Sequence, residues 1–196
     1  MRDAGMISCK LLRTVISLTN SRKLYDDKVG QLSLVNRTLV DELEPTLTNL
    51  FQSDAQQFAR VIAARNSRDK AIDKKEERKF VAKERRELKE ATEIPLAIAR
   101  NCISLAEHSL VIFDLGYKSA RGDSCVAASA SIAAAIGALS IVYLNLRKFD
   151  DGEWALKCRA QADKLMPLAL KLQGQLLNRI SVLNGKDQMS SLVTLN

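Results

Sequence analysis

One run of residues restricts the fold of this chain more than any other feature, because positions 125–146 carry no charged side chain. The run reads CVAASASIAAAIGALSIVYLNL, and its 22 residues are long enough for a helix that crosses a bilayer. Its first half consists mainly of Ala and Ser, which insert weakly into lipid. A helix that is apolar on all sides is also what the centre of a large helical protein requires. We therefore expect a buried central helix and keep a membrane span as the alternative.

The rest of the sequence also favours long helices. Only 8 Gly and 3 Pro interrupt 196 residues, and no stretch of useful length alternates apolar and polar side chains as a strand would. Apolar side chains recur at helical spacing in four further segments, at residues 5–19, 26–64, 92–115 and 153–183. We predict an all-α fold, a bundle of long helices around the buried Ala-rich central helix.

Proline, threonine and glycine mark the expected boundaries. Pro45 should kink or divide its helix, since proline removes a backbone donor and crowds the preceding turn. Thr92 is expected to cap a new helix that carries Pro95 in its first turn. Gly185 is expected to end the last helix, which leaves one domain over residues 1–185 and a loose tail over 186–196.

The net charge of +7 is concentrated in one segment. Residues 65–90 contain eleven Lys or Arg and seven Asp or Glu, which is +4 of the total. Mixed signs of this kind are typical of a solvated helix face. A polyanionic partner such as nucleic acid is the alternative, but it is not favoured because Phe80 is the only aromatic side chain available there for stacking.

The chain offers little for metal or nucleophilic chemistry. Its four cysteines form no CxxC pair, so we expect reduced core thiols and a cytoplasmic protein. A single histidine, His108, cannot build a two-histidine metal site, and we expect no metal. Acid–base work would therefore fall to carboxylates and lysines.

Two polar residues at the ends of the uncharged run are notable. Asp123 precedes it, where a carboxylate can either cap the helix or be tuned for proton transfer by buried surroundings. Asn145 lies within the run near its end, so its amide must hydrogen-bond to a neighbouring helix, a subunit or a ligand.

Several segments in order resemble one family. They are LTNSRKLYDD, SDAQQFARV, ATEIPLAIARNC, GDSCVAASASIAAAIGALSIVYLNL and DDGEW, and the similarity runs over residues 4–182. Together they are similar to the folate cyclodeaminase/cyclohydrolase family, which includes formiminotetrahydrofolate cyclodeaminase and a bacterial methenyltetrahydrofolate cyclohydrolase. The resemblance implies an all-helical homodimer that binds a tetrahydrofolate derivative, with or without a polyglutamate tail, and needs neither a metal nor another cofactor.

The resemblance also implies the residues of the site. The family's aspartates correspond to Asp54 and Asp123, which would handle protons. Lys70 corresponds to the family's catalytic lysine if the alignment shifts by one residue. The ligand-binding positions correspond to Arg22, Lys23, Tyr117 and Asn145, with the first two suited to the glutamate carboxylates.

The sequence departs from the family pattern at positions that are expected to surround the ligand. The family's P-x-P-G-G-G loop has no counterpart before residue 4, and Tyr117 stands where relatives carry asparagine. Gly122 and Ile141 replace a serine and an asparagine beside the site. The alternative function is therefore a helical homologue without catalysis that serves as a binding or assembly module, and we expect poor turnover of folate.

Overall fold

The computed structural model describes the backbone of residues 2–193 and the side chains of residues 5–181 and 183. Over this part of the chain it contains helices and no strand, in the order α1 (Arg2–Asn20), η1 (Lys23–Lys28), α2 (Val29–Thr38), η2 (Leu39–Leu43), α3 (Glu44–Asp69), α4 (Lys74–Leu115), η3 (Lys118–Ala120), α5 (Arg121–Leu146) and α6 (Glu153–Val193). The predicted all-α fold is confirmed.

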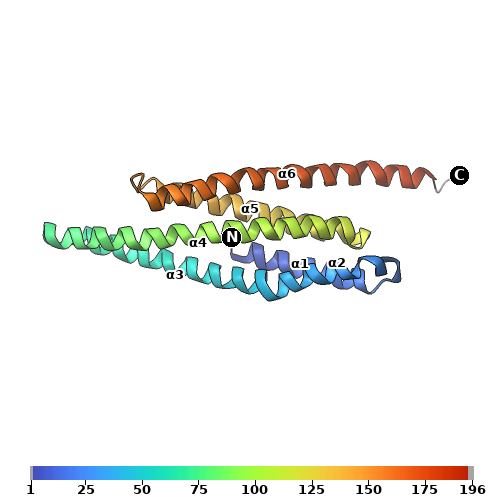
Figure 1. The fold of residues 1–196 in the computed structure, drawn as a ribbon, viewed down its shortest axis with the longest axis horizontal. Helices are drawn as coiled ribbons and strands as arrows, with labels where there is room; N and C mark the ends of the chain where they lie inside the picture. The colour runs from blue at the N-terminus through green and yellow to red at the C-terminus, as the bar shows by residue number, and fades with distance from the viewer. Residues whose placement is uncertain (1, 194–196) are drawn as a thin grey trace.

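The helices lie along one long axis (Figure 1). The apolar helix α5 packs most extensively on α4 and also on α1 and α6, as the predicted central helix should. By length and composition alone, α4 and the segment Lys118–Leu146 could each cross a membrane, but 61% and 50% of their most apolar windows are buried against other helices. Packing inside the bundle thus accounts for much of their apolar character.

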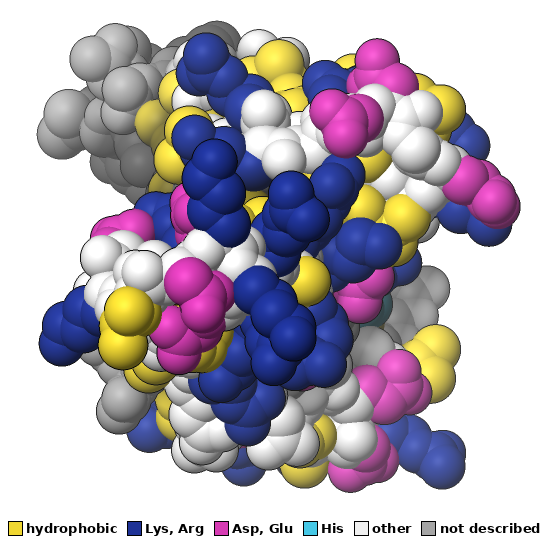
Figure 2. All heavy atoms as spheres, turned by 90° about the vertical axis from the view of Figure 1, so that its left-hand side faces the viewer, with side chains coloured by type: hydrophobic (Ala, Val, Ile, Leu, Met, Phe, Trp, Pro, Cys, Tyr) yellow, Lys and Arg dark blue, Asp and Glu magenta, His cyan; other side chains and the backbone are white. Residues whose placement is uncertain are grey.

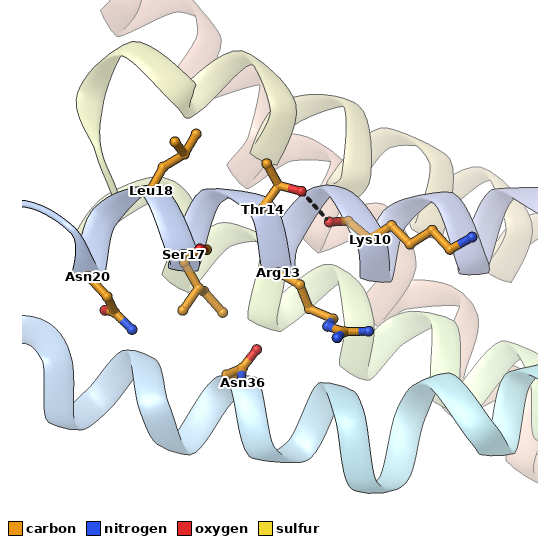
Figure 3. A pocket seen from close by; sticks show the side chains of 8 residues that line it. Lys10, Arg13, Thr14, Ser17, Leu18, Asn20 and Asn36 are labelled. Carbon is orange, nitrogen blue, oxygen red and sulfur yellow. Dashed lines mark hydrogen bonds between the residues drawn. The ribbon is translucent and has the colours of Figure 1, made fainter.

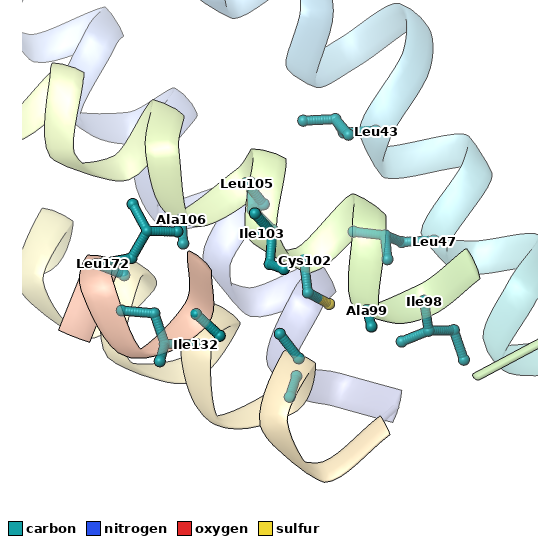
Figure 4. Close-up of a cluster of buried hydrophobic side chains, with 14 of the residues drawn as sticks. Leu43, Leu47, Ile98, Ala99, Cys102, Ile103, Leu105, Ala106, Ile132 and Leu172 are labelled. Atoms are coloured by element: carbon teal, nitrogen blue, oxygen red, sulfur yellow. The ribbon is translucent and has the colours of Figure 1, made fainter. Parts of the chain in front are cut away.

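The core is built where α4 and α5 meet, and Figure 4 shows one section of it, with α3, α4, α5 and α6 contributing side chains. Alanines occupy many of the contact positions, among them Ala99, Ala106, Ala128 and Ala135, each with no exposed surface. Small side chains let the two helix backbones approach closely. This close packing fixes α5 relative to α4, and the candidate site described below depends on it.

Pro45, which was expected to kink or divide its helix, marks a change in the helical hydrogen bonding. It lies in the first turn of α3, where its missing N–H is not needed. The chain reaches it through η2, a single π-helical turn in which the backbone N–H bonds reach one residue further back. The helical path from Val29 to Asp69 is therefore continuous but interrupted in its hydrogen bonding just before the proline.

The expected helix start at Thr92 is wrong. A single helix, α4, runs from Lys74 to Leu115 with Pro95 in its interior. The Thr92 hydroxyl donates to the carbonyl of Leu88 instead of capping. The true cap is Asp73, whose carboxylate accepts from the backbone N–H groups of Lys75 and Glu76.

Two other expected ends also differ. Asp123 does not cap α5, because the helix begins at Arg121 after the 3-10 turn η3, which places Asp123 in the first turn. The backbone of α6 passes Gly185 and stays helical to Val193, so the predicted stop is wrong. Residues 194–196 of the predicted loose tail lie outside the described residues.

Candidate functional site

A cavity of about 460 Å³ lies between α3, α4 and α5. This volume is within the usual range for small-molecule sites. The cavity combines an apolar wall with a few charged and amide groups, lined by Asp54, Phe58, Val61, Arg65, Leu88, Ala91, Ile141, Leu144, Asn145 and Lys148. Two residues predicted for the site, Asp54 and Asn145, are thus brought together although they are far apart in the sequence.

The start of α1 packs on α3 about one helical turn before the cavity. Near the start of α1, a Cβ built on Gly5 would lie 3.2 Å from a ring carbon of Phe51. Asp54 follows Phe51 by about one helical turn.

Asp54 is the carboxylate of this cavity. It is half-buried, and burial raises its pKa above the ordinary value of 3.8. Among the described residues no side chain forms an ion pair or hydrogen bond with it, so no cation holds it in the charged form. A carboxyl group in this state can take up and release a proton near a bound ligand.

Asn145 has a structural partner that explains why it is tolerated in an apolar helix. Its side-chain N–H donates to the carbonyl oxygen of Ala91 at 2.8 Å. Ala91 is four residues before Pro95, whose missing backbone N–H would otherwise bond to this carbonyl in the helix. The amide of Asn145 therefore replaces the absent donor and ties α5 to α4 at the cavity wall.

Cations stand at the mouth of the cavity. Arg65 forms an ion pair with Glu84 at 2.9 Å, while Lys148 is exposed and has no ion pair among the described side chains. Lys and Arg side chains gather over this end of the molecule, with Asp and Glu beside them (Figure 2). The sequence analysis did not assign Lys148 to the site. This lysine follows the end of α5 at Leu146, in a turn where its backbone N–H donates to the carbonyl of Asn145 at 3.0 Å.

Arg22 and Tyr117 also meet, but at the opposite end of α1. The Arg22 guanidinium carbon lies 3.7 Å from the centre of the Tyr117 ring. The pKa of the Tyr117 phenol is lowered, mainly by a hydrogen bond with Ser119 and to a smaller extent by one with Arg22. The backbone N–H of Tyr117 donates to the hydroxyl of Thr19 at 2.8 Å, which fixes the turn between α4 and α5.

Three further predicted site residues lie apart from the cavity within one chain. Asp123 is half-buried at the start of α5, about 33 Å along the helix axis from Asn145 at 1.5 Å per residue. Lys70 is exposed at the end of α3, about 24 Å along that helix from Asp54. Lys23 is exposed at the start of η1, beside Arg22.

A larger depression, of about 650 Å³, lies between α1 and α2 (Figure 3). Polar and basic side chains line it, including Lys10, Arg13, Thr14 and Asn36. It contains none of the predicted site residues. Within the described residues, no group of three or more His, Cys, Asp or Glu side chains is placed to hold a metal ion.

Similarity to known proteins identifies the family of this chain. A sequence model of the formiminotransferase-cyclodeaminase family matches residues 4–164. The chain belongs to this family.

A curated relative is the methenyltetrahydrofolate cyclohydrolase of Methylorubrum extorquens, which is 28% identical over 152 residues, or 78% of this chain and 72% of the relative. The crystal structure of formiminotetrahydrofolate cyclodeaminase from Thermotoga maritima has the same fold, with a TM-score of 0.78 over 93% of this chain and 85% of that one. Its sequence identity is 18%, so it supports the fold alone.

Proposed function

We propose that this chain binds a tetrahydrofolate derivative in the cavity between α3, α4 and α5 and transforms the one-carbon bridge between two folate nitrogens. The observation that carries the proposal is Asp54, a carboxyl with a raised pKa on the wall of an apolar cavity, next to the fixed amide of Asn145. The family match and the cyclohydrolase relative supply the class of ligand.

In the cyclohydrolase direction, water adds to the methenyl carbon and loses one proton to Asp54. One carbon–nitrogen bond of the bridge then breaks, and Asp54 returns that proton to the departing nitrogen. The remaining hydroxyl proton goes to solvent as the formyl carbonyl forms, so the reaction releases one proton in total. A raised pKa suits a carboxyl that must act as a base and then as an acid.

The cyclodeaminase reaction is the second candidate, favoured by the family match over residues 4–164. There, one folate nitrogen attacks the carbon of the protonated formimino group carried on its neighbour, and the amino group of the resulting tetrahedral carbon accepts a proton and leaves as ammonia. The same carboxyl can remove the proton from the attacking nitrogen and supply it to the leaving group.

The cations at the mouth suit the anionic end of the ligand. Lys148 carries no competing ion pair among the described residues, and Arg65 lies on the same rim. Carboxylates of a glutamate or polyglutamate tail would gain charge-assisted hydrogen bonds there. We further propose that the protein acts as a homodimer.

The test is a near-ultraviolet assay of the methenyl chromophore, run as hydrolysis and as formation from formimino-folate. Asp54→Asn should lower the turnover number by about 10²–10⁴-fold, the usual range for a general acid–base. Retention of full activity would remove Asp54 from the chemistry. Folate binding without turnover in the unaltered protein would instead identify a binding module.

A further inference from the structure

The charges on the first part of α4 are separated by sign. With about 3.6 residues per turn, the eight cations of residues 74–89 fall within about half of the helix circumference. All are exposed, and together they form the cationic face of α4: Lys74, Lys75, Arg78, Lys79, Lys83, Arg85, Arg86 and Lys89. The four acids of the same segment fall in the opposite half, at Glu76, Glu77, Glu84 and Glu87. The mixed composition that favours an ordinary solvated face therefore conceals a face of one sign.

Two of these acids hold α4 on α3. Glu84 accepts hydrogen bonds from Arg65 at 2.9 Å and from Arg68 at 2.6 Å, both on α3. Glu87 accepts one from the side-chain amide of Gln57, also on α3, at 2.9 Å. Because these carboxylates are engaged between the two helices, they leave most of the cationic face without a counter-charge.

Most cations of this face have no ion-pair partner. Among the described side chains, only Arg85 and Arg86 of the eight form ion pairs, with Asp150 at 3.1 Å and with Glu87 at 3.6 Å. The side chain of Asp150 is 96% exposed, so water screens its pair strongly. The remaining cations are spread over about 23 Å of helix. Like charges at this spacing repel one another, and an anionic partner would relieve the repulsion.

The face belongs to a part of the molecule that a partner can reach. In Figure 1, α3 and the first part of α4 project beyond the turn between α5 and α6. Lys and Arg side chains gather over the same end of the molecule in Figure 2. The helix α3 covers the opposite side of α4 through the bonds of Glu84. A partner can therefore lie along the face without displacing any helix of the bundle.

The side chains between the cations indicate which polyanion fits. Ala82 is the one uncharged residue within the cationic face. A helix that lies on a membrane carries large apolar side chains beside its cations, and a site for single strands carries exposed aromatic rings. The rings of Phe149 and Trp154, near the end of the face, are half-buried and packed on each other with centroids 4.8 Å apart. Cations without apolar side chains between them suit the closely spaced phosphates of a duplex.

We propose that the cationic face of α4 binds the phosphate backbone of a nucleic-acid duplex without reading its sequence. Five of the eight cations are lysines, which contact phosphates as point charges. The face contains no Asn or Gln for recognition of base edges. One straight row, Lys75, Lys79, Lys83 and Arg86, lies within about a quarter of the circumference and can contact about four phosphates. This binding uses no residue of the cavity that contains Asp54.

Fluorescence anisotropy with a labelled 20-base-pair DNA duplex tests the proposal. Four phosphate contacts correspond to a slope of about −3.6 for log K against log salt concentration, so the affinity should fall about 10²-fold between 50 and 200 mM salt. Two duplexes of unrelated sequence should bind equally. Binding that does not depend on salt, or that occurs with one sequence alone, would overturn the proposal.

Paired charge reversals locate the contact. Lys79→Glu with Lys83→Glu should lower the affinity at least tenfold at 50 mM salt and roughly halve the salt slope, because two of the four contacts are lost. Lys79→Gln with Lys83→Gln, which adds no acid, should act in the same direction. The matched control is Lys164→Glu with Lys171→Glu, at exposed positions of α6, which changes the net charge equally and should stay within about twofold of the unaltered affinity. Equal losses in the two reversed pairs would show that binding follows net charge alone.

Vesicles that contain phosphatidylserine are the alternative ligand. Ile72, in the turn before α4, is 93% exposed and is the apolar side chain that a membrane would take up. Ile72→Ser should leave duplex binding unchanged, and sedimentation should show weaker binding to vesicles than to duplex. Stronger binding to vesicles that is lost in Ile72→Ser would overturn the proposal in favour of a membrane surface. Because no folate is used, these results are independent of the proposed function.

Discussion

At the scale of single residues, the raised pKa of Asp54 has a measurable cost for stability. The folded chain binds this proton more tightly than the unfolded chain does, so the free energy of unfolding falls as the pH rises through the interval between the ordinary value of 3.8 and the higher folded value. Asp54→Asn removes this penalty. Its thermal midpoint should exceed that of the unaltered protein at pH 7, and the difference should shrink toward pH 3; equal midpoints at pH 7 would argue against a burial penalty.

Asn145 and Pro95 form a pair that can be tested as a unit. Asn145→Ala leaves the Ala91 carbonyl without its donor and should cost about 1–3 kcal/mol in urea unfolding. Pro95→Ala returns a backbone N–H to α4 that can bond to the same carbonyl. In the Pro95→Ala background, Asn145→Ala should therefore cost clearly less. Additive effects of the two substitutions would show that they do not share the Ala91 carbonyl.

The sequence identified Asp54 and Asn145, and the structure puts both in one cavity. Periodicity could not place them together, because this depends on how α3 and α5 cross α4. Lys148 was missed as a site residue for the same reason. Asn145 was expected to hydrogen-bond to another element, and the bond to Ala91 confirms this.

At the scale of the elements, the turn between α4 and α5 depends on Gly116. A Cβ at this position would lie 2.6 Å from the carbonyl oxygen of Ile112 and 3.0 Å from a methyl of Val15. Because the nearest atom is backbone, Gly116→Ala should destabilise the protein by about 1–3 kcal/mol. Gly174→Ala is the control: it lies inside α6 with no atom within 4 Å, and should stabilise by about 0.5–1 kcal/mol. Equal chemical-denaturation midpoints for the two variants would contradict this explanation.

The long helices were predictable where apolar spacing is regular, as in α5, and less so at their ends. Thr92 and Glu93 before Pro95 have the composition of a helix start, yet α4 runs through them. The partner that makes this possible, Asn145, is on another helix and 50 residues away from Pro95. Local sequence alone therefore could not distinguish a helix start from a helix that continues through a proline.

At the scale of the whole molecule, the bundle separates its polar features. Arg22 and Tyr117 stack at one end of α1, while Asp54 and the basic mouth of the cavity lie beyond its other end. Asp123, in the first turn of α5, does not line the cavity that contains Asp54. The sequence resemblance supplied the site residues as a set, but only the structure shows that one chain does not bring all of them together.

The basic mouth predicts a preference among folates. Lys148→Ala should weaken binding of a polyglutamylated folate by about tenfold or more, the effect of losing roughly 1.4 kcal/mol, and should change binding of the monoglutamate little. Raising the salt concentration should reduce the same preference in the unaltered protein. Titration calorimetry with the two ligands checks both effects, and equal affinities for the two ligands before substitution would show that the mouth does not hold the tail.

The most direct test of the account is calorimetric titration of tetrahydrofolate into the unaltered protein and two variants. Ala91→Phe places a ring in the cavity between α3, α4 and α5, whereas Ala82→Phe places the same ring on an exposed part of α4. We predict one binding site per chain, retained in Ala82→Phe and lost in Ala91→Phe. Binding that persists unchanged in Ala91→Phe, or no binding to the unaltered protein, would contradict the proposal that this cavity is a folate site.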